Sequence, residues 1–204
     1  MIILVFFLFA YGLLAFYKEF IYHPRISYIK SIQRISNIMQ QQNPAPTPRL
    51  AFIQLLQDNH PQAAAWVRGG SSFPQISGLV KFYDTPYGGT LVEAEVFGLP
   101  NIAVQGSTSF YAMHIHQNGD CSANFSKTGE HYDPTMQPHP EHAGDLLPLL
   151  GNQGYAWGAF YDKRFHVRDI LDRSVIIHAH RDDFTTQPSG DSGEKIACGV
   201  IRRP

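Results

Sequence analysis

Two alternating runs joined by a glycine turn constrain the fold of this chain more than any other feature. In the run 75–84, Val80 and Phe82 fall on one face, and Tyr83 falls on the other. In the run 90–97, three apolar residues alternate with two glutamates, and a Pro-Tyr-Gly-Gly turn lies between the runs. Side chains alternate between the two faces of a strand, so the two runs predict a β-hairpin.

Further short strands are predicted at 108–116, 155–161, 175–179 and 196–201. Glycine and proline are plentiful, at 17 and 14 residues, while charged residues make up only 16% of the chain. Short strands separated by long glycine- and proline-containing loops predict an all-β domain, either a sandwich or a barrel. The net charge of −1 gives no reason to expect nucleic acid as a partner.

The N-terminus predicts a membrane or export segment over residues 1–22. Residues 2–16 are almost entirely apolar, whereas about 20 apolar residues span a bilayer. No basic residue precedes this run and no clear cleavage site follows it, which favours an uncleaved anchor over a cleaved signal. The basic residues that follow it, from Lys18 to Arg34, would place the domain in the cytoplasm by the positive-inside rule. The topology therefore stays open.

Residues 23–62 are interpreted as a stalk and linker, and 63–204 as the folded domain. Isoleucines recur every three residues from 26 to 38, which favours a helical stalk or a solvated spacer. The proline-rich segment 43–48 ends any helix, and 49–60 can form another short helix.

Metal ligands are predicted in the second half of the chain. His114 and His116 lie two residues apart, so they share one face of a strand. His142 and Asp145 form a compact turn with Gly144 between them. Three histidines and a carboxylate suit zinc, and an all-imidazole set suits copper. The candidates are His114, His116, His131, His139, His142, Asp145 and His178, and His180 could share the face of His178.

The two cysteines, Cys121 and Cys198, are either a disulfide or two buried thiols. A bridge would close a loop of about 78 residues and contribute roughly 4 kcal/mol in the chain-entropy model. It would also imply an oxidising compartment.

At this point the sequence resembles a known family, the copper/zinc superoxide dismutases, over roughly residues 69–201. The short stretch between His116 and Cys121 is similar to that of bacterial members. The motifs that carry the resemblance are His114-Ile-His116, Gly119-Asp-Cys121, Gly129-Glu-His131-Tyr-Asp-Pro134, His139, His142-Ala-Gly-Asp145, Ile177-His178, Asp182-Asp183 and Ala197-Cys198-Gly-Val-Ile201.

The resemblance implies a Greek-key β-barrel or sandwich of eight strands, immunoglobulin-like, with long metal-binding and electrostatic loops. It implies a disulfide between Cys121 and Cys198, and Asp182 as a residue that hydrogen-bonds ligands of both metals. Lys195 occupies the position where the family usually has an arginine that attracts the anion. A lysine keeps that charge but loses the two-pronged donor. The implied ligands are His114, His116, His131 and His178 for copper, and His131, His139, His142 and Asp145 for zinc.

The implied activity is the disproportionation of superoxide by copper, with His131 bridging the two ions and relaying a proton. We expect an extracytoplasmic protein, either membrane-anchored or secreted, and a homodimer is among its possible assemblies. Two alternatives remain: a non-catalytic copper/zinc-binding module, and an interaction domain with a decayed site. The complete ligand set argues against the second alternative.

Overall fold

The computed structural model describes residues 30–32, 47–100 and 109–204. Its named elements, in chain order, are α3 (Pro48–Asp58), β1 (Ala63–Gly69), β2 (Ser77–Asp84), β3 (Thr90–Phe97), β4 (Phe110–Tyr111), β5 (Met113–His116), η2 (Ala123–Thr128), β6 (Leu149–Leu150), β7 (Tyr155–Asp162), η3 (Val167–Asp169), β8 (Ser174–His178) and β9 (Lys195–Arg202). The predicted anchor at 1–22 and most of the stalk lie outside the described residues. In the part of the chain that is described, no helix is long and apolar enough to cross a membrane.

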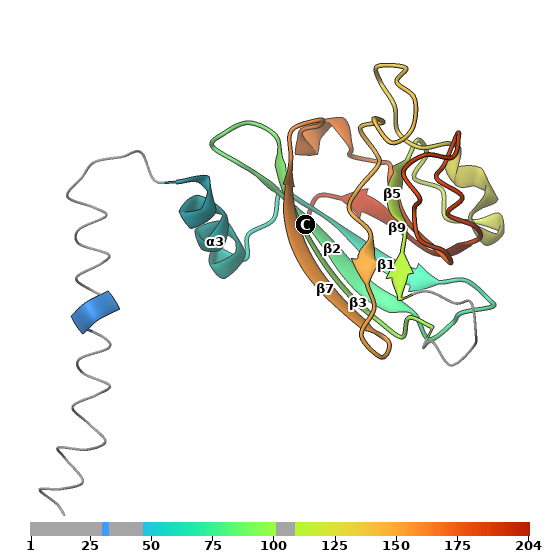
Figure 1. The fold of residues 1–204 in the computed structure, drawn as a ribbon, viewed down its shortest axis with the longest axis horizontal. Helices are drawn as coiled ribbons and strands as arrows, with labels where there is room; N and C mark the ends of the chain where they lie inside the picture. Colours follow the sequence, from blue (N-terminus) through green and yellow to red (C-terminus); the bar gives the residue numbers. More distant parts are fainter. Residues whose placement is uncertain (1–29, 33–46, 101–108) are drawn as a thin grey trace, which may run out of the picture. The chain divides into compact units, whose positions relative to one another are not determined.

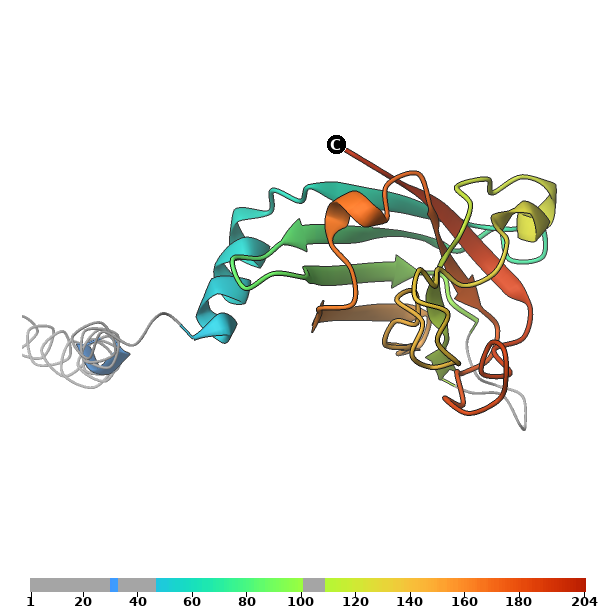
Figure 2. The same cartoon turned by 90° about the horizontal axis from the view of Figure 1, so that it is seen from above.

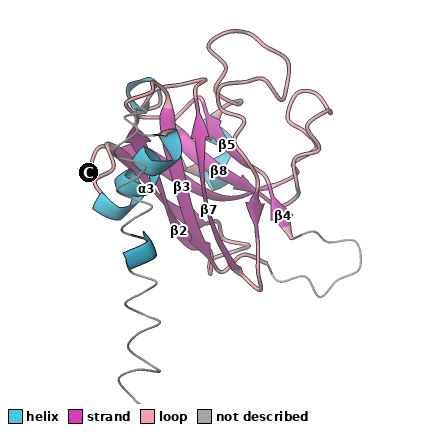
Figure 3. Ribbon diagram, turned by 60° about the vertical axis from the view of Figure 1, so that its left-hand side comes forward, coloured by secondary structure: helices cyan, strands magenta, loops and turns pink. Residues whose placement is uncertain are grey.

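Antiparallel strands form one curled sheet, in the order β5-β8-β9-β1-β2-β3-β7, and a small sheet of β4 and β6 (Figures 1 and 3). Only Ala112 separates β4 from β5, so the small sheet continues an edge strand of the large one. The all-β prediction is confirmed. The described residues form nine strand segments, so the expected count of eight is not confirmed.

The predicted hairpin is present as β2 and β3, which pair in register from Ser77 opposite Phe97 to Asp84 opposite Thr90. The turn between them approaches the end of β7 closely. A side chain at Gly89, where φ is 68°, would meet the Asp162 carbonyl oxygen at 2.4 Å. This turn therefore requires glycine, which has no Cβ and adopts positive φ without strain.

Side chains on the concave face of the sheet form the core. Val80, Phe82, Val92 and Val96 are fully buried there, as the alternation predicts. Tyr83 lies on the opposite face, as the alternation also predicts, and it is fully buried as well. Its hydroxyl donates to Glu93 over 2.9 Å, so the outer face of β2 is covered at this position rather than open to solvent.

The long loops gather around β5 and β9, as two perpendicular views show (Figures 1 and 2). They are the connection that runs from β5 through η2 to β6 and the connection between β8 and β9. The first is drawn in yellow to amber and the second in red. The helix α3 packs on the barrel through Phe52, whose ring lies 4.9 Å from that of Tyr161. The short helix predicted over 49–60 is thus present at 48–58.

Candidate metal centre

Three of the predicted ligands lie on two neighbouring strands of the large sheet. His114 and His116 belong to β5, which pairs with β8, and His178 is the last residue of β8. Side chains alternate along β5, so Met113 and Ile115 enter the apolar core while the histidines point the other way. The exposures of the three histidines are 0, 2 and 3%, so the imidazoles are buried despite their polarity.

The loops after β5 fold back along this strand and bring the other ligands to it. Isolated antiparallel bridges join His116 to His131 and His114 to Asp145. Backbone hydrogen bonds continue this ladder between β5 and the two loop segments. The strand therefore positions ligands that follow it in sequence by fifteen residues or more.

The predicted ligands form two groups of four, and His131 belongs to both. In each group every residue offers one ligand atom, and these atoms all lie within 4.8 Å of one another. All seven predicted ligands are therefore brought together, whereas His180 belongs to neither group. The groups are His114, His116, His131 and His178, and His131, His139, His142 and Asp145.

Three buried ring nitrogens have no hydrogen-bond partner among the described residues: His114 Nδ1, His131 Nε2 and His139 Nδ1. The third lies 3.0 Å from Asp145 Oδ2, but without hydrogen-bond geometry. A buried polar atom without a partner costs about 1–3 kcal/mol, and a metal ion would take up such a lone pair. All three atoms belong to the two ligand groups, so the residues present fit bound metal ions.

Backbone carbonyls hold the opposite nitrogens of two rings. His116 Nδ1 donates to the Gly129 carbonyl over 2.8 Å, and His178 Nδ1 donates to the Gly193 carbonyl over 3.1 Å. A hydrogen bond at the far nitrogen fixes the orientation of an imidazole and leaves the near nitrogen as a lone-pair donor. Backbone contacts thus fix the orientation of both rings within the group.

Asp182 links the two groups through hydrogen bonds to one imidazole of each. Its two carboxylate oxygens accept hydrogen bonds from His114 Nε2 and His139 Nε2, each over 2.8 Å. Burial alone would favour the neutral acid, but the bonds from His114, the Phe184 amide and His139 outweigh it and lower the pKa of Asp182 to about 2. The carboxylate is therefore ionised at neutral pH and lies where the sequence predicted it to contact ligands of both groups.

Burial also sets the protonation state of three rings in the first group. Desolvation lowers the pKa of His116 to about 2, of His178 to about 3 and of His114 to about 4. A neutral imidazole is the form that binds a metal ion. These rings thus offer their lone pairs throughout the physiological pH range.

The predicted disulfide between Cys121 and Cys198 is present, with a Cα–Cα distance of 5.8 Å. It ties the loop that carries η2 to β9. On the same strand, the Lys195 ammonium donates to Thr128 Oγ1 over 2.9 Å and to the Gly129 carbonyl over 3.2 Å. This carbonyl also accepts the His116 bond, so Lys195 is half-buried beside the first group, and burial lowers its pKa.

Sequence reasoning missed the side chains that hold the loop backbone, Arg164 and Gln187. Arg164 contacts residues 139–145 across nineteen or more positions of sequence, and Gln187 across 48, which no local periodicity reveals. The only signal is the pair Asp162-x-Arg164 at the end of a predicted strand, and such pairs are common on protein surfaces.

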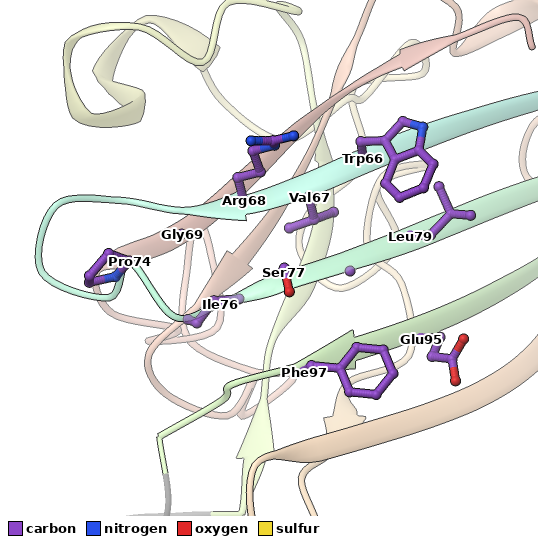
Figure 4. A pocket seen from close by; sticks show the side chains of 11 residues that line it. Trp66, Val67, Arg68, Gly69, Pro74, Ile76, Ser77, Leu79, Glu95 and Phe97 are labelled. Carbon is purple, nitrogen blue, oxygen red and sulfur yellow. The ribbon is translucent and has the colours of Figure 1, made fainter.

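A shallow groove on the outer face of β1, β2 and β3 contains none of the predicted site residues (Figure 4). Trp66, Leu79 and Phe97 contribute apolar walls, and Arg68 and Glu95 contribute charge. The groove is therefore a feature of the sheet surface and plays no part in the ligand groups.

Taken together, a curled antiparallel sheet and two ligand groups sharing one histidine define a class of β-barrel proteins with a two-metal centre. The family model for copper/zinc superoxide dismutase matches residues 76–201. The chain belongs to the copper/zinc superoxide dismutase family, whose cofactors are copper and zinc.

Known relatives include both enzymes and chaperones. The extracellular superoxide dismutase [Cu-Zn] of Rattus norvegicus is 34% identical over 137 residues, which cover 63% of this chain and 55% of that protein. The copper chaperone for superoxide dismutase of Sus scrofa is 29% identical over 155 residues, covering 70% and 53%. The chain thus spans about half the length of these relatives. Both are mammalian, and the expected likeness to bacterial members stays a prediction.

A similar solved structure is the crystal structure of the clock protein EA4, with a TM-score of 0.60 and 27% sequence identity. The likeness covers 71% of this chain and 96% of that one. The curled antiparallel sheet is therefore shared with a protein of known structure.

Proposed function

We propose that this protein is a superoxide dismutase, which converts two superoxide anions and two protons into dioxygen and hydrogen peroxide. The observation that carries the proposal is His131, which belongs at once to an all-imidazole group and to a group containing a carboxylate. A shared imidazole couples a site suited to copper with a site suited to zinc.

The ligand assignment follows from the donor sets. Four imidazoles suit copper, so the copper ligands are His114, His116, His131 and His178. Three imidazoles and a carboxylate suit a closed zinc site, so the zinc ligands are His131, His139, His142 and Asp145. When bound, copper supplies the one-electron redox chemistry, and zinc supplies a fixed positive charge.

The protein residues supply geometry, a proton and charge. His131 Nε2 is buried without a protein partner, and it is the atom at which the chain can hold a proton and pass it on. The opposite nitrogen, Nδ1, lies 2.7 Å from Asp145 Oδ1, which fixes the ring. His131 is therefore the proposed proton relay.

Lys195 is the proposed anion-attracting residue. Its ammonium lies near the first ligand group and carries the positive charge that the usual arginine supplies. A positive charge beside the site would attract the anionic substrate and raise its rate of encounter. Two hydrogen bonds restrain the ammonium, so we expect Lys195 to act as a fixed charge beside the site rather than as a mobile arm.

A second candidate is a non-catalytic copper/zinc-binding module. It is supported by the match to copper chaperones for superoxide dismutase, in which the related segment forms about half of the protein. Such a module would use the same ligands without turning over superoxide.

The finer architecture and location belong to the same proposal. If β4 and β5 count as one strand interrupted at Ala112, the nine segments become the eight strands of a Greek-key barrel. The disulfide favours an oxidising, extracytoplasmic location, as does the extracellular rat relative. Residues 1–22 would anchor or export the domain at 63–204, and a homodimer is its proposed assembly.

The test uses the full-length chain after loading with copper and zinc. Elemental analysis and a superoxide-decay assay are made on the same sample. The dismutase should contain both metals and show fast, cyanide-sensitive decay. Both metals without decay would favour the binding module, and zinc without copper would contradict the dismutase.

A further inference from the structure

We infer that Arg164 and Gln187 are positioning residues that together clamp the backbone of loop 139–145 and thereby set its affinity for zinc. The inference rests on the proposed function, because this loop carries His139, His142 and Asp145. Neither residue offers a ligand atom to either group.

Arg164 follows β7 and is anchored there by the last residue of that strand. Its Nε lies 3.1 Å from Asp162 Oδ1 and its Nη2 lies 2.7 Å from Asp162 Oδ2, a two-pronged ion pair. The Arg164 amide also donates to Asp162 Oδ1 over 2.8 Å. Asp162 is only 8% exposed, so the guanidinium is fixed on the rigid sheet rather than free in solvent.

The free edge of the same guanidinium contacts the loop at three backbone carbonyls. Nη1 donates to the Pro140 carbonyl over 3.2 Å and to the His142 carbonyl over 2.9 Å, and Nη2 donates to the Asp145 carbonyl. Two of these carbonyls belong to predicted zinc ligands. A planar guanidinium can bind an anchor on one edge and several acceptors on another, which an ammonium cannot do.

Gln187, from a separate segment of the chain, holds the beginning of the loop. Its Oε1 accepts from the His139 amide over 3.0 Å, and its Nε2 donates to the His139 carbonyl over 2.7 Å. The side-chain amide thus pairs with both backbone groups of one ligand residue, as a neighbouring strand would. Gln187 lies in the β8–β9 connection, which also carries Asp182.

These contacts matter because residues 139–145 form no helix or strand of their own, and β5 pairs with the loop only at its end, at Gly144 and Asp145. Ordering a free backbone costs about 1–2 kcal/mol per residue, and an unclamped loop would pay that cost when the metal binds. With the clamp, the loop becomes ordered when the protein folds rather than when the metal binds. Three ligands are therefore preorganised before any ion arrives. Residues that orient metal ligands typically change metal affinity by about 10- to 100-fold when replaced.

The test measures zinc affinity and loop order in the full-length chain. We expect Arg164→Met and Gln187→Ala each to raise the zinc Kd by about 10- to 100-fold in competition with a chromophoric chelator. Amide hydrogen exchange in 139–145 should accelerate in the metal-free variants. The visible absorption of copper(II) at the all-imidazole group should keep its wild-type position, because neither side chain hydrogen-bonds a member of that group.

Arg168→Met is the matched control, because Arg168 lies four residues away with a 77% exposed side chain and only a 3.6 Å ion pair to its neighbour. Arg164→Lys keeps the charge without the fork and should recover only part of the affinity. Full recovery by lysine would overturn the role of the fork. Gln187 is exposed, so its truncation tests the clamp without leaving a cavity.

Failure of the clamp and failure of the proposed function give different results. A wild-type chain that takes up no zinc would overturn the function, while amide exchange would still report on the clamp. A wild-type chain that binds zinc, with Arg164→Met and Gln187→Ala matching Arg168→Met in both Kd and exchange, would overturn the clamp alone.

Discussion

At the scale of single residues, the site depends on partners that hold ligands as much as on the ligands themselves. Asp182 bonds one imidazole of each group and is 4% exposed, so it couples the two groups through one carboxylate. Removing a buried acceptor of this kind leaves two ring N–H groups without their bonds, which costs more than the loss of a surface contact.

We therefore expect Asp182→Asn to weaken the binding of both metals, by about 10- to 100-fold each. An amide can accept one of the two N–H bonds but presents its own donors to the other ring. Calorimetric titration with zinc and copper measures the change. Asp191→Asn is the control, because Asp191 is exposed on the same loop. Equal affinities in the two variants would refute the orienting role of Asp182.

The pH dependence of stability should include a contribution from Tyr83. Burial, reinforced by the bond to Glu93, raises the pKa of this phenol above its usual value of 10. Below pH 10 the phenol is neutral in both the folded and the unfolded chain, so its contribution is complete. Above pH 10 only the unfolded chain releases the proton, and the stability due to Tyr83 falls as the pH rises.

Tyr83→Phe tests this dependence by urea unfolding. At pH 7 the variant should be about 1 kcal/mol less stable, because the bond to Glu93 is lost. At pH 11 the difference should shrink or reverse, because phenylalanine has no proton to release. The same deficit at both pH values would show that ionisation of Tyr83 does not contribute.

At the scale of elements, the sequence predicted the regular structure well and the irregular structure poorly. The runs at 75–84 and 90–97 are β2 and β3 because alternation is a property of the strand itself. The two-residue strand β6 was missed, since its pairing with β4 depends on a partner far away in sequence. Alternation placed Tyr83 correctly on the face opposite Phe82, but it could not show what covers that face.

The disulfide joins two elements, the η2 loop and β9, and its removal should be costly. Cys121→Ser is expected to lower the free energy of unfolding by about 2–5 kcal/mol, since the unfolded chain regains the freedom of a long loop. Urea unfolding with and without a reducing agent measures the loss. Reduced wild-type protein should match the variant, and a variant as stable as oxidised wild type would contradict the prediction.

At the scale of the whole molecule, the sheet is a rigid frame on which loops assemble the site. Ligand identities could be read from spacing because strand and turn geometry fix which residues share a face, as for His114 and His116. The supports at Arg164 and Gln187 could not, because each depends on how separate loops approach one another. Resemblance to the family supplied the pairing of cysteines, which spacing alone left open.

Zinc should stabilise the whole domain, since it binds only the folded arrangement of ligands from separate loops. At a free concentration 1,000 times its Kd, a ligand adds about 4 kcal/mol to the free energy of unfolding. Thermal unfolding of metal-free and zinc-loaded chains measures the shift in Tm. Magnesium at the same concentration should have no effect, because a site rich in imidazole does not suit it. An unchanged Tm with zinc would argue against a formed site.

The hydrogen bonds at the outer ring nitrogens determine how many protons are released when the metal ions bind. His114, His116 and His178 already keep their single proton on the nitrogen that faces a protein acceptor, so they can bind an ion without releasing one. His131 belongs to both ligand groups, so under the proposed assignment its neutral imidazole would have to give up its last proton to serve two ions. Filling both groups at pH 8 should therefore release roughly one proton per chain, which calorimetry in buffers of different ionisation enthalpy would count.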